Sequence, residues 1–176
     1  MRTLIVYESM YGNTHAVAEA IARGICAAGD VTTIPVSQAP QQDVSSYDLL
    51  IVGGPTHVHG MSRESTRRGA VEAAEKPESN LTLEPDAASA GLREWLDGLT
   101  VDEGNAAAFD TRIDKSALIT GRASKGISKK LRHLGFELVA DPESFLVDTN
   151  TQLVDGEEAR AQHWGQMLAK QSPAHT

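Results

Sequence analysis

The segment from Ser9 to Thr14, Ser-Met-Tyr-Gly-Asn-Thr, combines side-chain hydroxyls, a glycine and consecutive backbone N–H groups just before a helical pattern. Because the first N–H groups of a helix have no partner within it, such a segment can bind an anion. The segment contains no Lys or Arg, and it lacks both the Gly-Lys-Ser/Thr ending of triphosphate loops and the Gly-x-Gly-x-x-Gly of dinucleotide sites. The residues therefore predict a site for one terminal phosphate monoester. The alternative is a loop that only caps the helix.

Two further segments follow apolar runs in the same way. Gly53-Gly54-Pro55-Thr56 comes after the apolar residues 49–52, and Asp110-Thr111-Arg112 comes after the small-residue run 106–109. In a parallel sheet, ligands bind at the carboxyl ends of the strands, where the winding of the chain reverses. We therefore expect the three loops to form one site.

The elements that must position these loops alternate along the chain. Apolar runs predict strands, and apolar residues at helical spacing predict helices. Strands are expected at 4–7, 31–36, 49–52, 106–109 and 136–147, and helices at 14–25, 62–74, 91–99, 122–134 and from 155 onward. Asp141-Pro142 interrupts the last strand and places it at a sheet edge. The pattern predicts an α/β fold with a doubly wound, five-stranded parallel sheet.

The whole chain fits a single domain. Its 176 residues suit one core, with residues 1–171 as the domain, 172–176 as a flexible tail and 75–89 as an exposed excursion. The net charge of −8 disfavours nucleic acid as a partner. No apolar run is long enough for a membrane span, and the start of the chain lacks the pattern of a signal peptide, which predicts a cytoplasmic protein.

Redox or metal chemistry based on cysteine is not expected. Cys26 is the single cysteine, so it cannot form an internal disulfide or a Cys-based metal site, and we expect it to be buried in helix packing. His15, His133 and His163 have no ligand-like spacing with carboxylates, and we predict no metal site. Any redox chemistry would then require an organic cofactor.

The first loop and its flanks carry a family resemblance. Ile5-Val6-Tyr7, Ser9, Gly12, Thr14, Ala18 and Ile21 occur at the positions of the signature by which flavodoxins are recognised. The wider layout resembles the small flavodoxin-domain proteins of actinobacteria, through Gly53-Gly54-Pro55-Thr56-His57, Met61-Ser62-Arg63, the segments 91–96 and 109–112, and Glu157-Glu158-Ala159-Arg160. The resemblance covers nearly the whole chain, and it implies a flavodoxin-like fold with strand order 2-1-3-4-5.

This resemblance implies flavin mononucleotide (FMN) as the cofactor. By similarity, the first loop would hold the FMN phosphate and the other two loops would line the isoalloxazine ring. The implied phosphate ligands are Ser9, Met10, Tyr11, Gly12, Asn13 and Thr14. The implied ring-lining residues are Pro55, Thr56, His57, Val58, His59, Gly60, Asp110, Thr111 and Arg112, with Phe109 just before the third loop.

The chain departs from many flavodoxins because no Trp or Tyr stands in the second or third loop. His57, His59 and Met61 are the available substitutes, and an alternative is that only one of the two histidines meets the ring. Gly60 would either allow a peptide to reorient or simply turn the chain. Trp95 and Trp164 stand at helical spacing with leucines, which predicts a place in the core.

Two groups of cations near the predicted site have alternative roles. Arg112 would place a permanent charge near the flavin, which favours its reduced anionic form, or it would form an ion pair with Asp110 or Asp114. The arginines at 63, 67 and 68 would attract an acidic substrate or form a solvated helix face.

Three functions remain in competition. The first is an electron carrier or FMN-dependent oxidoreductase that exchanges electrons with a partner protein or with a small-molecule donor or acceptor. The second is an enzyme of the quinone reductase or protoporphyrinogen oxidase type, for which residues 57–68 and the excursion up to Gly91 would form a substrate shelf. The third is a binding or regulatory module on the same fold without flavin.

Overall fold

The computed structural model describes residues 1–101 and 103–171. The predicted tail, residues 172–176, lies outside the described residues. No helix in the described part of the chain is long and apolar enough to cross a membrane.

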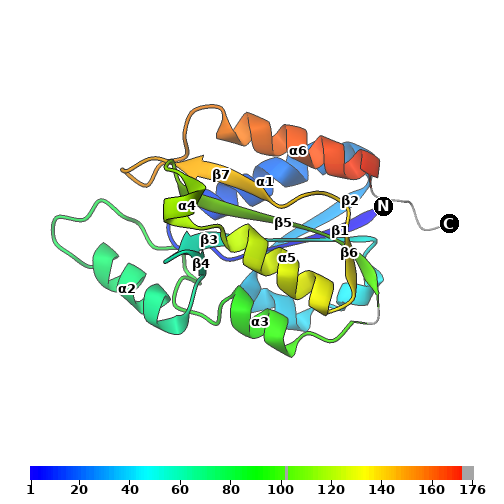
Figure 1. Ribbon diagram of the computed structural model, residues 1–176, viewed down its shortest axis with the longest axis horizontal. Coiled ribbons are helices and arrows are strands. Elements are labelled where there is room, and N and C mark those ends of the chain that lie inside the picture. Colours follow the sequence, from blue (N-terminus) through cyan, green and yellow to red (C-terminus); the bar gives the residue numbers. More distant parts are fainter. Residues whose placement is uncertain (102, 172–176) are drawn as a thin grey trace.

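The centre of the protein is a parallel sheet with the order β2-β1-β3-β5-β6, in which β7 also pairs with β5 (Figure 1). Its strands are β1 (Arg2–Tyr7), β2 (Asp30–Pro35), β3 (Leu49–His57), β5 (Gly104–Ile113), β6 (Phe136–Leu138) and β7 (Glu143–Val147). Strands β6 and β7 pair with opposite ends of β5, and Asp141-Pro142 lies in the gap between them. The predicted flavodoxin-like order and the interrupted edge strand are confirmed.

Helices cover both faces of the sheet (Figure 1). On one face, α1 (Asn13–Ile25) packs against α6 (Glu157–Gln171), and on the other lie α3 (Leu92–Gly98) and α5 (Ala123–His133). The remaining helices are α2 (Glu64–Ala74), α4 (Ala117–Thr120) and the 3-10 turns Cys26–Ala28, Val36–Gln41 and Val44–Ser46. Sequence reasoning missed α4 and the short strand β4 (Gly60–Met61), because both are too short to show a period.

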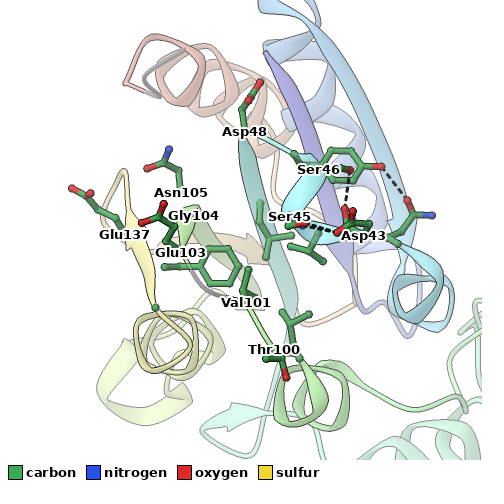
Figure 2. A pocket seen from close by; sticks show the side chains of 17 residues that line it. Asp43, Ser45, Ser46, Asp48, Thr100, Val101, Glu103, Gly104, Asn105 and Glu137 are labelled. Atoms are coloured by element: carbon green, nitrogen blue, oxygen red, sulfur yellow. Dashed lines mark hydrogen bonds between the residues drawn. The ribbon is translucent and has the colours of Figure 1, made fainter. Parts of the chain in front are cut away.

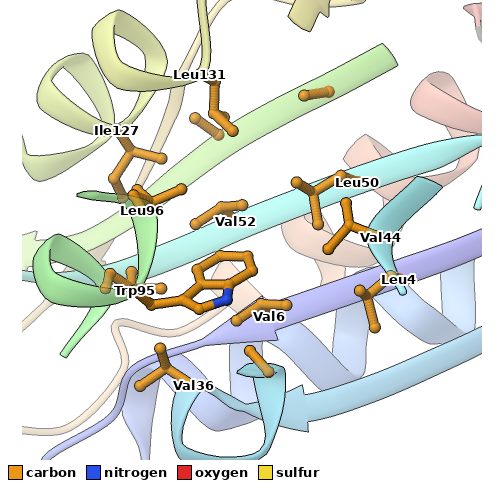
Figure 3. Close-up of a cluster of buried hydrophobic side chains, with 14 of the residues drawn as sticks. Leu4, Val6, Val36, Val44, Leu50, Val52, Trp95, Leu96, Ile127 and Leu131 are labelled. Atoms are coloured by element: carbon orange, nitrogen blue, oxygen red, sulfur yellow. The ribbon is translucent and has the colours of Figure 1, made fainter. Parts of the chain in front are cut away.

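Each face of the sheet has its own hydrophobic core. Figure 3 shows the core under α3 and α5, where Trp95 packs among aliphatic side chains. In the core under α1 and α6, Phe109, Phe145 and Trp164 meet edge to face with centroids 6.1 to 6.4 Å apart. Both tryptophans lie in the core, as predicted. Cys26 does not, because it falls in the 3-10 turn after α1 and is exposed, so that expectation was wrong.

Close approach of α1 and α6 depends on glycine. A Cβ built on Gly24 would lie 2.1 Å from the Gln162 carbonyl oxygen, whereas one on Gly69 in α2 meets nothing within 4 Å. We expect Gly24→Ala to lower the free energy of unfolding by about 2 kcal/mol, since a backbone atom cannot move aside. Gly69→Ala should raise it by up to about 1 kcal/mol through helix propensity. Urea unfolding of both variants measures these changes. Equal changes in the free energy of unfolding would refute the role of Gly24 in the close approach of the two helices.

A hollow of about 890 Å³ lies at the amino ends of the central strands (Figure 2). Its rim carries Asp43, Asp48, Glu103 and Glu137, and none of the residues that line it is Lys, Arg or His. It lies at the end of the sheet opposite to the one where parallel sheets bind ligands. Its size alone therefore does not make it the candidate site.

Candidate functional site

A second cavity, of about 190 Å³, lies at the carboxyl ends of β1, β3, β5 and β7. All three loops predicted from the sequence contribute to its wall. The lining residues are Ser9, Met10, Tyr11, Asn13, Thr14, Pro55, Thr56, His57, Thr111, Arg112, Ile113, Val147, Asp148, Thr149 and Thr151. This is the candidate site, because it joins the predicted loops at the end of the sheet where such folds bind ligands.

The first loop presents an open helix N-terminus to this cavity. Gly12 adopts φ +93°, which favours glycine, and its N–H donates to the Ser9 hydroxyl at 3.1 Å. Among the described residues, no side chain caps the backbone N–H groups at the start of α1, and its first turn contains no acidic residue. The first-turn N–H groups are therefore available to an anion, and the donor set fits a phosphate.

Hydrogen bonds join the first loop to two others. The Thr14 and Thr111 hydroxyls share a hydrogen bond of 2.7 Å, and both side chains are buried. The Asn13 side chain donates to the Thr151 carbonyl at 2.9 Å. Thr151 belongs to a fourth loop that sequence reasoning missed, although the polar run Asp-Thr-Asn-Thr after the last strand is a turn signal. Asp148 shapes this loop by accepting the N–H groups of Asn150 and Gln152.

The second loop is a hairpin between β3 and β4. His57 pairs with Gly60, so Val58 and His59 form its two-residue tip, with φ of +43° and +71°. Only His57 of the two histidines lines the cavity, whereas His59 is exposed and bridges to Gly121. Burial lowers the pKa of His57, and Arg67 adds to this effect while Glu8 opposes it. His57 is therefore neutral at neutral pH.

The residues of the third loop lie partly in the core and partly in the cavity wall. Phe109 and Asp110 are fully buried, and Phe109 packs in the core, so neither side chain forms part of the cavity wall. Thr111 and Arg112 do line the cavity. The Arg112 guanidinium donates to the Lys115 carbonyl at 2.6 Å and to the Ile113 carbonyl at 3.3 Å. Within the described residues, no carboxylate lies within ion-pair distance of Arg112, so the alternative of a pair with Asp110 or Asp114 is not seen.

Comparison with known families settles the class of protein. The family model described as Flavodoxin matches residues 5–164, which include the first three loops. The chain belongs to the flavodoxin family. The family places it among flavin-dependent redox proteins.

Solved flavodoxin structures share this fold along their whole length. A flavodoxin from the domain Archaea is 20% identical, with a TM-score of 0.65 over 98% of this chain and 99% of its own. Oxidised Flavodoxin 1 from Bacillus cereus is 19% identical, with a TM-score of 0.65 over 97% and 98%. A WrbA-like flavodoxin from Agrobacterium tumefaciens is 18% identical, with a TM-score of 0.58 over 96% and 95%. A search of curated proteins gives no significant match.

In this flavodoxin-family chain, α2 and residues 75–90 support the first loop from outside. The Glu84 N–H donates to the Met10 carbonyl at 2.8 Å, and the Tyr11 hydroxyl donates to the Ala70 carbonyl at 2.7 Å. The Glu84 carboxylate lies 3.0 Å from Nδ1 of His15. From residues 57–91, only His57 lines the cavity, so the structure does not bear out the expected substrate shelf.

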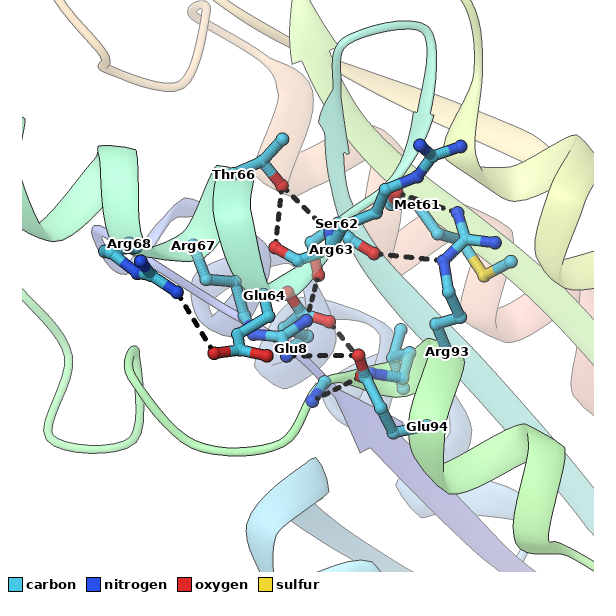
Figure 4. Close-up of polar contacts among 12 residues, drawn as sticks. Glu8, Met61, Ser62, Arg63, Glu64, Thr66, Arg67, Arg68, Arg93 and Glu94 are labelled. Atoms are coloured by element: carbon cyan, nitrogen blue, oxygen red, sulfur yellow. Dashed lines mark hydrogen bonds and ion pairs between the residues drawn. The ribbon is translucent and has the colours of Figure 1, made fainter.

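A buried polar cluster lies behind the second loop of the flavodoxin fold (Figure 4). Arg67 is 5% exposed and donates to the Ser62 hydroxyl and to Glu94. Glu8 is also 5% exposed and accepts the Leu92 N–H, while its other oxygen has no partner in the described residues. Arg93 donates to the Met61 and Ser62 carbonyls.

These contacts revise the predicted arginine cluster. Arg67 is buried and structural, and Arg68 pairs with Glu64 on the exposed face of α2. Arg63 is exposed at the start of that helix. The three arginines therefore do not form one basic surface.

Asp110 gives the stability of the flavodoxin fold a pH dependence that can be measured. Burial raises the pKa of Asp110, and the contacts with Ser124 and Ser144 and the charge of Arg112 oppose this only in part. A raised pKa means that folding favours the protonated acid, so the ionised acid costs stability as pH rises through that pKa. Asp110→Asn should therefore raise the free energy of unfolding by about 1 kcal/mol at pH 7.

The gain should vanish at a pH low enough for wild-type Asp110 to be protonated. Asp114→Asn is the matched control, because Asp114 is exposed and its substitution should change little. Urea unfolding from acid to neutral pH compares the variants. A destabilised Asp110→Asn at pH 7 would contradict the assignment.

Proposed function

We propose that the chain binds FMN at this cavity and acts as a cytoplasmic electron-transfer protein. The observation that carries the proposal is the open, uncapped N-terminus of α1 beside a cavity built from all three predicted loops. Backbone N–H groups and hydroxyls there suit a phosphate, which riboflavin lacks. The family match supports a flavin as the cofactor.

The residues divide into three roles under this proposal. Ser9, Gly12, Asn13 and Thr14 hold the phosphate, Pro55 to His57 and Thr111 to Arg112 line the ring, and Asp148 and Thr151 close the remaining wall. Bound flavin supplies the capacity to accept and release one or two electrons. The protein orients it, limits access of water and sets its electrostatic environment.

An electron carrier is favoured over an enzyme that reduces quinones or oxidises a porphyrinogen. Residues 83–87 of the expected substrate shelf, together with Ala70 of α2, instead pack against the outer side of the phosphate loop. A module without flavin is disfavoured, since the phosphate loop keeps both its left-handed glycine and its free N–H groups.

An absorption spectrum of the purified protein tests the cofactor. We expect the bands of a flavin, and acid release followed by chromatography should identify FMN. Protein that stays colourless after incubation with excess FMN would refute the proposal. Release of another flavin in place of FMN would refute the assignment of the phosphate loop.

Arg112 should raise the reduction potential of the bound flavin. A unit charge about 4 Å away contributes roughly 4 kcal/mol at an effective dielectric constant of about 20, before screening. We expect about 1 to 2 kcal/mol to remain, so Arg112→Gln should lower the potential for the second electron by about 40 to 90 mV. Redox titration measures this shift.

Lys115→Gln is the matched control, because Lys115 is exposed and does not line the cavity. His57→Gln is the comparison at a ring-lining residue without a permanent charge, since burial lowers the pKa of His57. If the potential stays constant in Arg112→Gln while FMN remains bound, the charge of Arg112 does not act on the flavin. The role of Arg112 is then limited to its hydrogen bonds with backbone carbonyls.

A further inference from the structure

The apolar side chains that are most exposed gather beside the cavity. Among the described residues, five large hydrophobic side chains are exposed, and four of them, Val58, Ile113, Leu118 and Ile119, come from segments at its rim. Their exposed fractions are 81%, 46%, 96% and 65%. Met167, on α6, is the fifth. We call these four residues the apolar rim, and such a grouping marks an interaction site more often than scattered exposure does.

Backbone contacts hold the segments of the apolar rim together. Ile113 ends β5 and lines the cavity, and Leu118 and Ile119 belong to α4. His59 bridges to Gly121, just after α4, where a Cβ on Gly121 would lie 2.3 Å from the His59 carbonyl oxygen. The hairpin tip and the end of α4 are therefore in direct contact.

Val58 is held in an unfavourable conformation at the hairpin tip. A β-branched residue at φ +43° is rare, and two-residue turns of this kind favour Asn and Gly. Its side chain is 81% exposed, so packing within the chain does not account for its presence. Strain of this kind accumulates at functional sites, which supports a role for the Val58 side chain outside the fold.

The segment that carries three of the four rim residues has a charge opposite to that of the whole chain. From 112 to 125 the chain carries Arg112, Lys115, Arg122 and Lys125 against the single acid Asp114, whereas the net charge of the protein is −8. Lys115 and Lys125 are exposed. Residues 112–125 are thus apolar and basic, and although Asp148 also lines the cavity, this segment is complementary to an acidic surface.

We propose that the apolar rim and its basic border form the docking surface for an acidic redox protein whose contact face has an apolar centre. This inference rests on the proposed function, because docking there brings the partner next to the flavin. It differs from the expectation that an acidic body meets a basic partner, since charge beside the site and not net charge determines the docking orientation.

The test measures binding of two redox proteins of opposite charge. The ¹⁵N-labelled full-length protein, with its flavin content recorded, is titrated with an acidic [2Fe–2S] ferredoxin and, separately, with basic cytochrome c. We expect the ferredoxin to shift the amide signals of the apolar rim, and its Kd to rise with salt. Tighter binding of cytochrome c at the rim, or ferredoxin-induced shifts confined to another face, would overturn the proposal.

Variants separate docking from folding. Leu118→Ser/Ile119→Ser and Val58→Asn should each weaken ferredoxin binding about 10-fold, and Lys115→Glu/Lys125→Glu by at least as much. Asn tolerates the backbone at 58, so Val58→Asn should lose binding without loss of thermal stability. Met167→Ser, at the exposed hydrophobic residue outside the rim, is the matched control. Equal losses in Met167→Ser would overturn the proposal.

Other occupants of the surface would give different results. If the amide signals of the apolar rim shift with protein concentration alone, the surface binds a second copy of this chain. If they shift with menadione but not with ferredoxin, the surface binds a small apolar electron acceptor. Either result overturns the proposal. A yellow protein that binds no ferredoxin contradicts only the docking inference, whereas a protein without flavin contradicts the proposed function.

Discussion

Flavin-free protein should bind FMN at least about 100-fold more tightly than riboflavin, because two or more charge-assisted hydrogen bonds to the phosphate contribute about 1.5 to 3 kcal/mol each. The structure supports this through Gly12, whose left-handed conformation begins α1, and through the first-turn N–H groups, which no side chain caps. Titration monitored by quenching of flavin fluorescence gives both dissociation constants. Equal affinities for FMN and riboflavin would refute the prediction that this loop binds the FMN phosphate.

The hydroxyls of that loop should contribute to the preference for FMN over riboflavin. Ser9→Ala and Thr14→Ala should each reduce FMN affinity by about 1 to 3 kcal/mol and leave riboflavin affinity much less affected. Tyr11→Phe shows the effect of loosening the loop alone, since the Tyr11 hydroxyl donates to the Ala70 carbonyl, and it should change both affinities alike. A loss in Thr14→Ala that is equal for both flavins would assign Thr14 to its bond with Thr111 and not to the phosphate.

The sequence predicted those parts of the site that depend on local pattern. Continuous apolar runs located β1 and β3, and the loops after them could be located because ligand sites in parallel sheets lie at strand ends. The same reasoning placed Arg112 at the site, and the structure brings it to the cavity wall. Phe109 was included because it is next to that loop, but alternation along β5 turns it into the core.

The parts that were missed depend on contacts between distant segments. Asp148 and Thr151 follow β7, whose place beside β5 was predicted, but the contact of their loop with Asn13 in the first loop was not. Arg67 appeared as part of a solvated charged helix, yet α3 and the end of β1 cover it. Burial of a charged residue follows from tertiary packing, and hydrophobic periodicity alone does not reveal it.

The buried cluster around Arg67 should carry one of the largest stability effects in the chain. Arg67 Nη1 lies 2.4 Å and Glu8 Oε2 lies 2.7 Å from the position of a Cβ on Gly91, so both charged groups lie beside Gly91, although the ion pair of Arg67 is with Glu94 and not with Glu8. Arg67→Met would remove the cation beside a buried carboxylate that has one oxygen unpartnered in the described residues. We expect a loss of about 3 kcal/mol in the free energy of unfolding, measured with urea.

Arg68→Met is the matched control, because Arg68 and its partner Glu64 are exposed, and its effect should stay within about 0.5 kcal/mol. Adding Glu8→Gln to Arg67→Met tests the cause, since a neutral amide no longer needs the cation. If the charge of Glu8 is responsible, the double variant recovers part of the lost stability. If the double variant is as unstable as the sum of the two single variants, Arg67 stabilises the second loop through Ser62 and Glu94 alone, and the coupling to Glu8 is refuted.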